Sequence, residues 1–549
     1  LNLQHGLRFL TDSLVLDSDV KIKNKTTISG FCRTKNWVER QYFFTLHFNR
    51  EFDSVIELPK GPKENAPKYV LNFESLSDRQ LQLKVALSSV STDGAENNLN
   101  TELSHWKFDE VKNKAKTIWN SYLQRIEIEA PLKQKQIFYT AMYHALIHPS
   151  NIADVDGRYR GADDQIAKTE SGEYYSTLSL WDTYRASHPL FTILTPERVD
   201  GFVETMLAHH KAQGYLPIWT AWGKENHCMI GNHAIPVITD AYMKGFKGFD
   251  ADEALQAMIE STTENHLNSD WELYDNYGYY PFDFIDNEAV SRTLESGYDD
   301  YCVALLAEQL GKDSIAEVYY KRSKYYKNLF DPETKLMRGK DSKGNFRTPF
   351  EPLVPTSPMN NPGDYTEANA WQYSWASTQH DIEGFIELVG GKEAFTKLLD
   401  DFFSIEGEDN KHLGQEALIG QYAHGNEPSH HISYLYKYSN TPEKADQLIK
   451  QIYKQFYNNT PDGITGNDDC GQMSAWYIFS TLGFYPVNPA NGEFVLGYPQ
   501  VETAIIHLGD GNTFTIDTSH NGNIHLNSVL HKEKVIMYND IVSGGTLSF

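Results

Sequence analysis

The chain has 549 residues, 40% of them hydrophobic, and a formal net charge of -25. This length predicts two or three domains, and the acidity argues against nucleic acid or an anionic membrane as a partner. The sequence contains no run of about 18 apolar residues, the length that a helix needs to cross a bilayer. The cysteines form no CxxC pair, so neither a zinc ribbon nor a disulfide framework is indicated.

Residues 1–105 are expected to form a β-sandwich, because short alternating runs such as 41–48 and 81–87 are separated by polar turns. This pattern begins abruptly, and the chain starts at Leu1 rather than Met, without a signal peptide. We therefore expect a trimmed or internal start and a sandwich that is incomplete at its N-terminus.

Residues 106–486 are expected to be helical, because apolar residues recur there at helical spacing, mostly in paired segments. About a dozen such segments without a fixed sequence repeat favour an α/α toroid over a solenoid. The candidate helices are 106–127, 132–147, 180–193, 196–212, 232–245, 251–265, 291–310, 313–329, 367–376, 380–403, 429–438, 442–457 and 470–482. Residues 487–549 return to short strands, and Asn521-Gly522 is typical of a hairpin turn.

Two aromatic islands allow a structural and a functional interpretation. Asp182 and Arg185 lie three residues apart and could pair on a helix, or Asp182 could accept hydrogen bonds from a sugar stacked on Trp181. Trp219 and Trp222 flank a loop and could form a stacking wall or simply pack in a core.

Glu367 begins a candidate helix in which Trp371 and Trp375 share a face. Desolvation by such aromatics would raise its pKa, as a general acid requires. A position in the first helical turn would lower the pKa instead, and the sequence leaves both open.

The segment from His424 to His431 combines three histidines with Asn426 and Glu427. No zinc motif such as HExxH is present, and the oxygen-rich ligands suit a hard cation such as Ca²⁺ better. Turn chemistry with an early proline is the structural alternative.

Asp468 and Asp469 sit between glycines just before an apolar helix. One could cap that helix, or the glycines could let a substrate approach a catalytic base. There is no GxSxG motif, P-loop or GxGxxG motif. Two carboxyl groups acting on a glycosidic bond is therefore the simplest chemistry for this set of residues.

Five motifs in this order resemble glycoside hydrolase family 92: LWDTYRASHP, CMIGNHA, YTEANAWQYSW, HGNEPSHHISYLY and GNDDCGQMSAWYIFSTLGFYPV. The resemblance covers nearly the whole chain. It implies a calcium-dependent, exo-acting, inverting α-mannosidase, periplasmic or secreted, that acts on α-mannoside oligosaccharides, with α-1,2 or α-1,3 linkages favoured. It also implies an N-terminal β-sandwich followed by an (α/α)6 toroid with the site between them.

The resemblance implies roles for individual residues. Glu367 matches the general acid, and Asp469 matches the base, with Asp468 in support. Some members carry a third Asp where this chain has Asn467, which leaves open how the base function is shared among residues 467–469. The implied calcium ligands are Gln372, Glu427 and the backbone carbonyl of Asn426.

Substrate contacts are expected on both sides of the site. Trp181, Asp182 and Arg185 match the substrate-recognition segment, and Trp37 resembles an aromatic contributed by the sandwich. Trp222 and His424 complete the candidate set. The alternatives are a carbohydrate-binding protein without catalysis and another (α/α)6 enzyme such as a polysaccharide lyase, which the acidic net charge disfavours.

Overall fold

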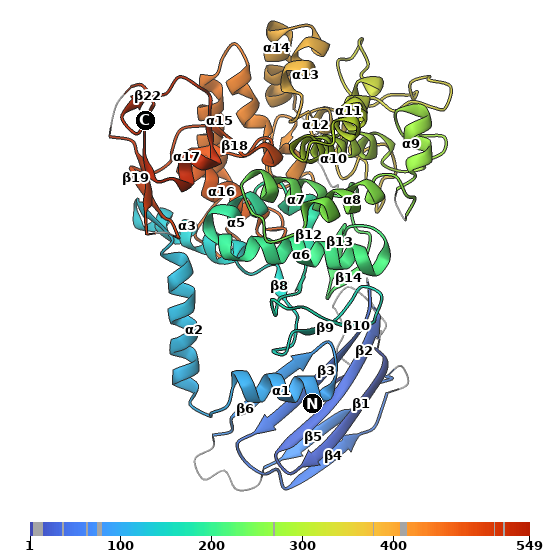
Figure 1. Cartoon of the computed structure of the whole chain (residues 1–549), viewed down its shortest axis with the longest axis vertical. Coiled ribbons are helices and arrows are strands. Elements are labelled where there is room, and N and C mark those ends of the chain that lie inside the picture. The colour runs from blue at the N-terminus through green and yellow to red at the C-terminus, as the bar shows by residue number, and fades with distance from the viewer. Residues whose placement is uncertain are drawn as a thin grey trace.

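The computed structural model describes residues 1–3, 15–35, 38–61, 64–73, 80–266, 269–376, 378–406, 414–509, 511–519 and 522–549. An N-terminal β region lies below a large helical region, and a C-terminal sheet lies at one side (Figure 1). Helix α2 (Phe108–Leu123), which has no buried residue, joins the first two regions. Trp37 and Asn521, expected to contact substrate and to form a turn, lie outside the described residues.

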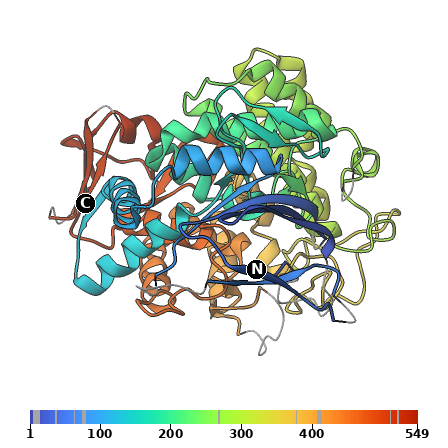
Figure 2. The same ribbon diagram turned by 90° about the horizontal axis from the view of Figure 1, so that it is seen from below.

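The N-terminal region is built on an antiparallel sheet in the order β1-β2-β3-β6. Ile22, Ile28, Leu46 and Val85 are neighbours across these strands, but only Ile28 and Leu46 are buried. The elements are β1 (Val15–Asn24), β2 (Thr27–Lys35), β3 (Glu39–Phe48), β4 (Ser54–Leu58), β5 (Lys68–Asn72), β6 (Leu83–Ser88) and α1 (Thr92–Glu102). The β4–β5 hairpin packs on the centre of this face, and α1 packs against β3 and β6. Seen from below, the sheet lies in front of the helical region (Figure 2).

The helical region resembles the predicted one, because most of its helices begin and end within a few residues of the apolar segments. Several segments differ: 180–193 is interrupted after Thr183, and 429–438 is largely a 3-10 helix. Segment 313–329 ends in a 3-10 helix, and the end of 106–127 runs into a strand. The helices are α3 (Leu132–Ala145), α4 (Leu180–Thr183), α5 (Ser187–Leu194), α6 (Pro196–Gln213), α7 (Ala234–Met243), α8 (Ala251–Ser261), α9 (Trp271–Tyr277), α10 (Ala289–Gln309), α11 (Asp313–Arg322), α12 (Ala370–Tyr373), α13 (Ile382–Val389), α14 (Lys392–Ser404), α15 (Glu443–Gln455) and α16 (Gln472–Leu482), with 3-10 helices η1 (Tyr325–Leu329), η2 (Glu427–Ser429) and η3 (Ile432–Tyr438).

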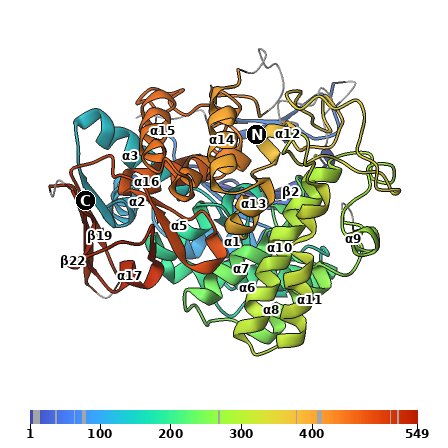
Figure 3. The ribbon, with the colours of Figure 1, turned by 90° about the horizontal axis from the view of Figure 1, so that it is seen from above.

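The C-terminal strands extend a sheet that starts before the helical region. Strand β7 (Ile126–Glu129) pairs with β19 (Thr503–His507) at the end of a six-stranded sheet, in the order β22-β21-β24-β20-β19-β7. This sheet lies at the rim of the helical region (Figure 3) and shares its hydrophobic core. The other elements are β17 (Phe484–Tyr485), η4 (Pro489–Asn491), β18 (Glu493–Leu496), β20 (Thr513–Asp517), β21 (His525–Leu526), β22 (Val529–Leu530), β23 (Val535–Met537), α17 (Tyr538–Val542) and β24 (Gly545–Ser548).

A buried arginine joins the N-terminal sheet to the hairpins above it. Arg40 on β3 donates from Nε to the carbonyl of Trp222 at 2.6 Å and from Nη1 to Asp164 at 2.9 Å. The ring of Trp222 meets Tyr42 edge-on. The short strands here and near the site are β8 (Ser150–Asn151), β9 (Arg158–Arg160), β10 (Ile166–Lys168), β11 (Tyr175–Ser176), β12 (Leu178–Ser179), β13 (Trp219–Ala221), β14 (Lys224–Glu225), β15 (Leu418–Ile419) and β16 (Tyr422–Ala423).

Among the described residues, no helix has the length and apolar character needed to cross a membrane.

Candidate active site

A cavity of about 1280 Å³ collects many of the predicted residues. Its walls come from α3, the β12–α4 segment, β13, the residues before α12, and the loops around 414–427 and 457–470. The predicted residues that line it are Trp181, Asp182, Glu367, Asn426, Glu427, Asp468 and Asp469. Trp222, Arg185, Gln372 and His424 are not part of this lining.

The two adjacent aspartates before α16 have different surroundings. Asp468 Oδ1 accepts hydrogen bonds from the amide of Ser474 at 3.0 Å and from its hydroxyl at 2.7 Å, so Asp468 caps the first turn of α16. The chain then turns through positive φ at Asp469, Cys470 and Gly471. A Cβ at Gly471 would lie 2.7 Å from Ala145 Cα, so only glycine fits beside α3.

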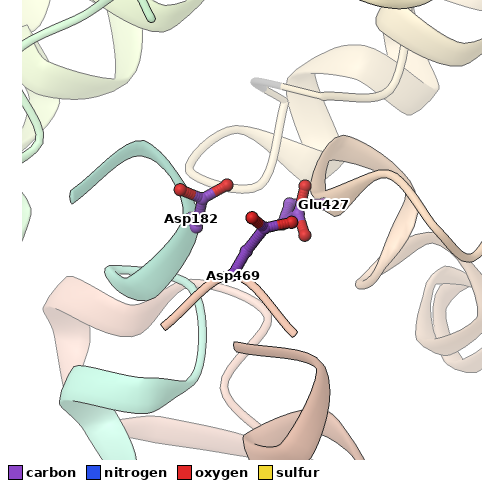
Figure 4. A group of neighbouring side chains, drawn as sticks. All are labelled: Asp182, Glu427 and Asp469. Carbon is purple, nitrogen blue, oxygen red and sulfur yellow. The ribbon is translucent and has the colours of Figure 1, made fainter. Parts of the chain in front are cut away.

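Asp182, Glu427 and Asp469, here called the acidic trio, come together from α4, η2 and the loop before α16 (Figure 4). Each offers an oxygen, and these oxygens lie within 4.8 Å of one another. Ser179 donates a hydrogen bond to Asp182, and Glu427 Oε1 is buried without a partner in the described part of the chain.

The acidic trio is electrostatically costly as it stands. Burial, together with the nearby charge of Asp469, raises the pKa values of Asp182 and Glu427 well above their usual range. Burial and the charge of Glu416 raise the pKa of Asp469 as well. Three clustered carboxylates need a proton or a cation between them, and an all-oxygen donor set suits a hard divalent cation. The residues therefore fit a metal ion.

Glu367 faces the same cavity from a strained turn. Its φ is +52°, and its backbone carbonyl accepts hydrogen bonds from Asn426 Nδ2 and Gln415 Nε2, each at 3.0 Å. Burial, then the charges of Asp469 and Glu288, raise the pKa of Glu367 to about 7. The expectation that Glu367 begins a helix is wrong, because Asn369 caps α12 and the helix begins at Ala370.

Residues 94–549 match the family model described as the glycosyl hydrolase family 92 catalytic domain. The chain belongs to glycosyl hydrolase family 92.

Solved structures support this membership along the chain. The chain is similar to a family GH92 α-mannosidase from Bacteroides thetaiotaomicron in complex with mannoimidazole, with a TM-score of 0.92 and 37% identity, over 98% of this chain and 74% of that one. It is also similar to a family GH92 inverting mannosidase from Bacteroides thetaiotaomicron VPI-5482, with a TM-score of 0.86 and 31% identity, over 97% and 76% of the two chains.

A curated relative is an uncharacterized secreted glycosidase from Arthroderma benhamiae, 26% identical over 487 residues. The match covers 81% of this chain, and the chain spans 56% of the length of that relative.

In this family 92 chain, Gln372 lies behind Glu367 rather than in the cavity wall. Its Oε1 accepts hydrogen bonds from the amide of Asn369 and from Gln415 Nε2, and its Nε2 donates to Gln415 and to the carbonyl of Gln421. The carbonyl of Asn426 accepts from the amide of Ser429 at 3.1 Å. Of the three implied calcium ligands, Glu427 is the one within the acidic trio. Its neighbours there are Asp182 and Asp469, for which the sequence suggested other roles.

The three histidines at 424–431 serve the packing behind the cavity. His424 lies between the hydroxyls of Tyr422 and Tyr457, each 2.7 Å away. His430 and His431 bond backbone carbonyls. Burial lowers the pKa of all three, to about 3 for His430 and about 4 for His431. They are neutral and hydrogen-bonded, as structural histidines are, and the described residues gather no zinc-type cluster there.

Arg185 is turned away from Asp182 and into a second buried network. Its Nε donates to the carbonyl of Trp181, and its guanidinium lies 3.5 Å from Glu295. Glu295 also contacts His233 at 3.1 Å, and His233 contacts Asp299 at 2.9 Å. The Asp182–Arg185 pair, one of the two interpretations of this segment, is absent among the described ion pairs, where Arg185 pairs with Glu295.

The sequence did not identify several cavity residues. Glu416, Asp462 and His144 all line it, and the buried indole N–H of Trp181 has no partner among the described residues. These positions lie far apart along the chain and carry no shared spacing, so only the fold reveals them together.

Proposed function

We propose that this chain is an exo-acting, inverting α-mannosidase that removes terminal mannose from α-mannosides, with α-1,2 or α-1,3 linkages favoured. The observation that carries the proposal is a cavity shared by Glu367, whose pKa is near 7, and by Asp469 on another wall. Two solved relatives described as an α-mannosidase and as an inverting mannosidase support it. The proposed scaffold is an N-terminal β-sandwich (1–105), an (α/α)6 toroid (106–486) and a C-terminal β region (487–549).

Glu367 is proposed as the general acid. With a pKa of about 7 it keeps its proton at the pH where an ordinary glutamate has lost it. It donates that proton to the glycosidic oxygen as the bond to the sugar breaks. Asn426 and Gln415 hold its backbone in the strained turn, so the carboxyl group is positioned before the substrate arrives.

Asp469 is proposed as the general base. It accepts a proton from a water molecule that attacks the anomeric carbon on the face opposite the leaving group. Inversion requires about 6.5–9.5 Å between the two carboxyl groups to admit that water. Asp468 is proposed as a supporting residue, because its carboxylate already binds Ser474.

Ca²⁺ is proposed as the cofactor. Glu427 would hold the ion, with the other two members of the acidic trio nearby. Gln372 and the Asn426 carbonyl remain proposed ligands. A bound ion would supply positive charge at the sugar hydroxyls. Trp181 also lines the cavity, and its indole N–H, without a partner among the described residues, is free to bind the sugar. Trp37 and Trp222 are proposed contacts from the sandwich side, and Arg185 and His424 are proposed to support the wall from behind.

The test is a set of α-linked mannobioses incubated with the protein, with NMR identification of the first anomer released. β-Mannose as first product supports inversion, and α-mannose contradicts it. Exhaustive chelation is expected to stop the reaction, and added Ca²⁺ to restore it. Full activity after chelation would contradict the metal assignment. A periplasmic or secreted location is proposed from the family resemblance and from the fungal relative described as secreted.

A further inference from the structure

The cavity has an unusual balance of charge. No lysine or arginine occurs among its described lining residues, and His144 and His148 are the only basic side chains there. Burial lowers the pKa of His148, which favours its neutral form. Carboxyl groups come from α4, from the residues before α12 and from the loops around 414–427 and 457–470: Asp182, Glu367, Glu416, Glu427, Asp462, Asp468 and Asp469.

Two of these carboxyl groups have no part in the proposed chemistry. Asp462 is exposed on the 458–463 loop, which is closed by a 2.8 Å hydrogen bond from the Asn458 amide to the Gly463 carbonyl. Glu416 lies against Gly425 and Gly466, where a Cβ on Gly466 would be 3.0 Å from its Oε2. Neither forms an ion pair within the described residues. Their charges would remain even with a divalent cation bound at the acidic trio.

The remaining lining near that loop mixes apolar residues such as Ile137 and Ile464 with uncharged polar ones. Gln136 and Thr140 on α3 and Asn458, Asn459 and Thr460 on the loop offer amide and hydroxyl groups. Such groups can donate to and accept from sugar hydroxyls without selecting for charge. An anionic leaving group would find hydrogen-bond partners here but no cation to neutralise it.

We propose that this cavity selects the leaving group by its charge. It accepts neutral or cationic leaving groups and rejects those that carry phosphate or carboxylate. The inference rests on the proposed mannosidase function and narrows its substrates to neutral glycans. The physical basis is repulsion between like charges in the cavity, which salt screens only partly at low ionic strength.

The test compares an α-mannobiose with the same disaccharide phosphorylated on the leaving sugar, away from the scissile bond. The expected kcat/KM is about a hundredfold higher for the neutral compound at low salt, since like-charge contacts are strongly unfavourable. The ratio is expected to shrink at 1 M salt, where the Debye length falls to about 3 Å. Asp462→Lys is expected to raise the relative rate on the phosphorylated compound by about tenfold.

Glu393→Lys on α14 is the matched control, because it makes the same charge change on an exposed residue outside the cavity lining. It is expected to leave the ratio unchanged. Similar kcat/KM values for both disaccharides at low salt would overturn the inference. So would equal effects of the Asp462 and Glu393 substitutions. If the wild-type protein cleaves neither disaccharide while correctly folded, the proposed mannosidase function itself fails.

Discussion

Two groups of buried or half-buried carboxylates lie near Trp181, and they differ in what surrounds them. Asp182, Glu427 and Asp469 face one another across the cavity and form no ion pair in the described structure. Glu295, at 0% exposure, contacts Arg185 and His233. Burial raises the pKa of Glu427, whereas in Glu295 burial is outweighed by His233 and Arg185, and its pKa is lowered.

This contrast shows that burial of an acid is not by itself the functional signal. When a buried carboxylate contacts cationic side chains, these stabilise its ionised form, and the group is part of the scaffold. A cluster of buried carboxylates without cations stores repulsion, which catalysis or ion binding can use. The predictions below test this distinction.

The largest effect is expected for Asp469→Asn. Loss of a general base should lower kcat on an α-mannobiose by about a hundredfold to ten-thousandfold. The melting temperature should hold or rise, because one member of a repelling trio is removed. Steady-state kinetics and thermal melts measure both. Asp468→Ala is the neighbouring control: it should lose about 1 kcal/mol of stability with the α16 cap. Near-wild-type turnover by Asp469→Asn would contradict the base assignment.

Glu295→Gln is expected to lower stability, whereas Asp469→Asn should leave it unchanged or raise it. Arg185 and His233 would lose a shared buried counter-charge, and stability should fall by about 3–5 kcal/mol. Urea unfolding measures the change. Glu393→Gln on exposed α14 is the control and should alter stability by less than about 0.5 kcal/mol. An unchanged urea midpoint for Glu295→Gln would remove the contrast between the two groups.

Calcium should stabilise the protein through a site that includes Glu427 of the acidic trio. A concentration of about one hundred times Kd should add about 2.7 kcal/mol to the wild-type stability. Glu427→Gln should abolish this gain, measured as the shift of the melting temperature between EDTA and calcium. Glu260→Gln, which changes a carboxylate outside the cavity lining, should preserve it. Equal calcium shifts in both variants would argue against a site at Glu427.

The smallest effect is expected in the pH dependence. Because Glu367 must be protonated to act and has a pKa of about 7, kcat/KM should fall as pH rises through about 7, approaching tenfold per pH unit. Its raised pKa also means that the protein loses some stability as pH rises from the unfolded value of about 4.5 to about 7. The Glu367→Gln variant should not show this fall of kcat/KM with rising pH. It should retain most activity on substrates with activated leaving groups. If kcat/KM of the variant still falls as the pH rises, the fall is due to another residue.

The helices were largely predictable because apolar spacing is a local property. The predicted segments 442–457 and 470–482 correspond to α15 at Glu443–Gln455 and α16 at Gln472–Leu482. The start of α12 was misplaced because the Asn369–Gln372 capping box overrode the acidic residue before it. The pairing of β7 with β19 joins distant segments, and no local pattern announces it.

The site was only partly predictable for a related reason. The motifs pointed to Glu367, Glu427 and Asp469, and these do share one cavity. Spacing could not show that Asp182 completes the acidic trio, nor that Arg185 would turn to Glu295, 110 positions along the chain. Those outcomes depend on how α4 is cut short and packed, which is a tertiary property.

The β7–β19 pair has a consequence for folding. Residues 126–129 bond to residues 503–506, so this sheet edge cannot close until residues 503–506 have been synthesised. At synthesis rates of about 5–20 residues per second, β7 would wait on the order of twenty to seventy seconds for its partner. During that interval its edge is open to non-native pairing. Removal of residues 503–549 should therefore leave β7 without its β19 partner.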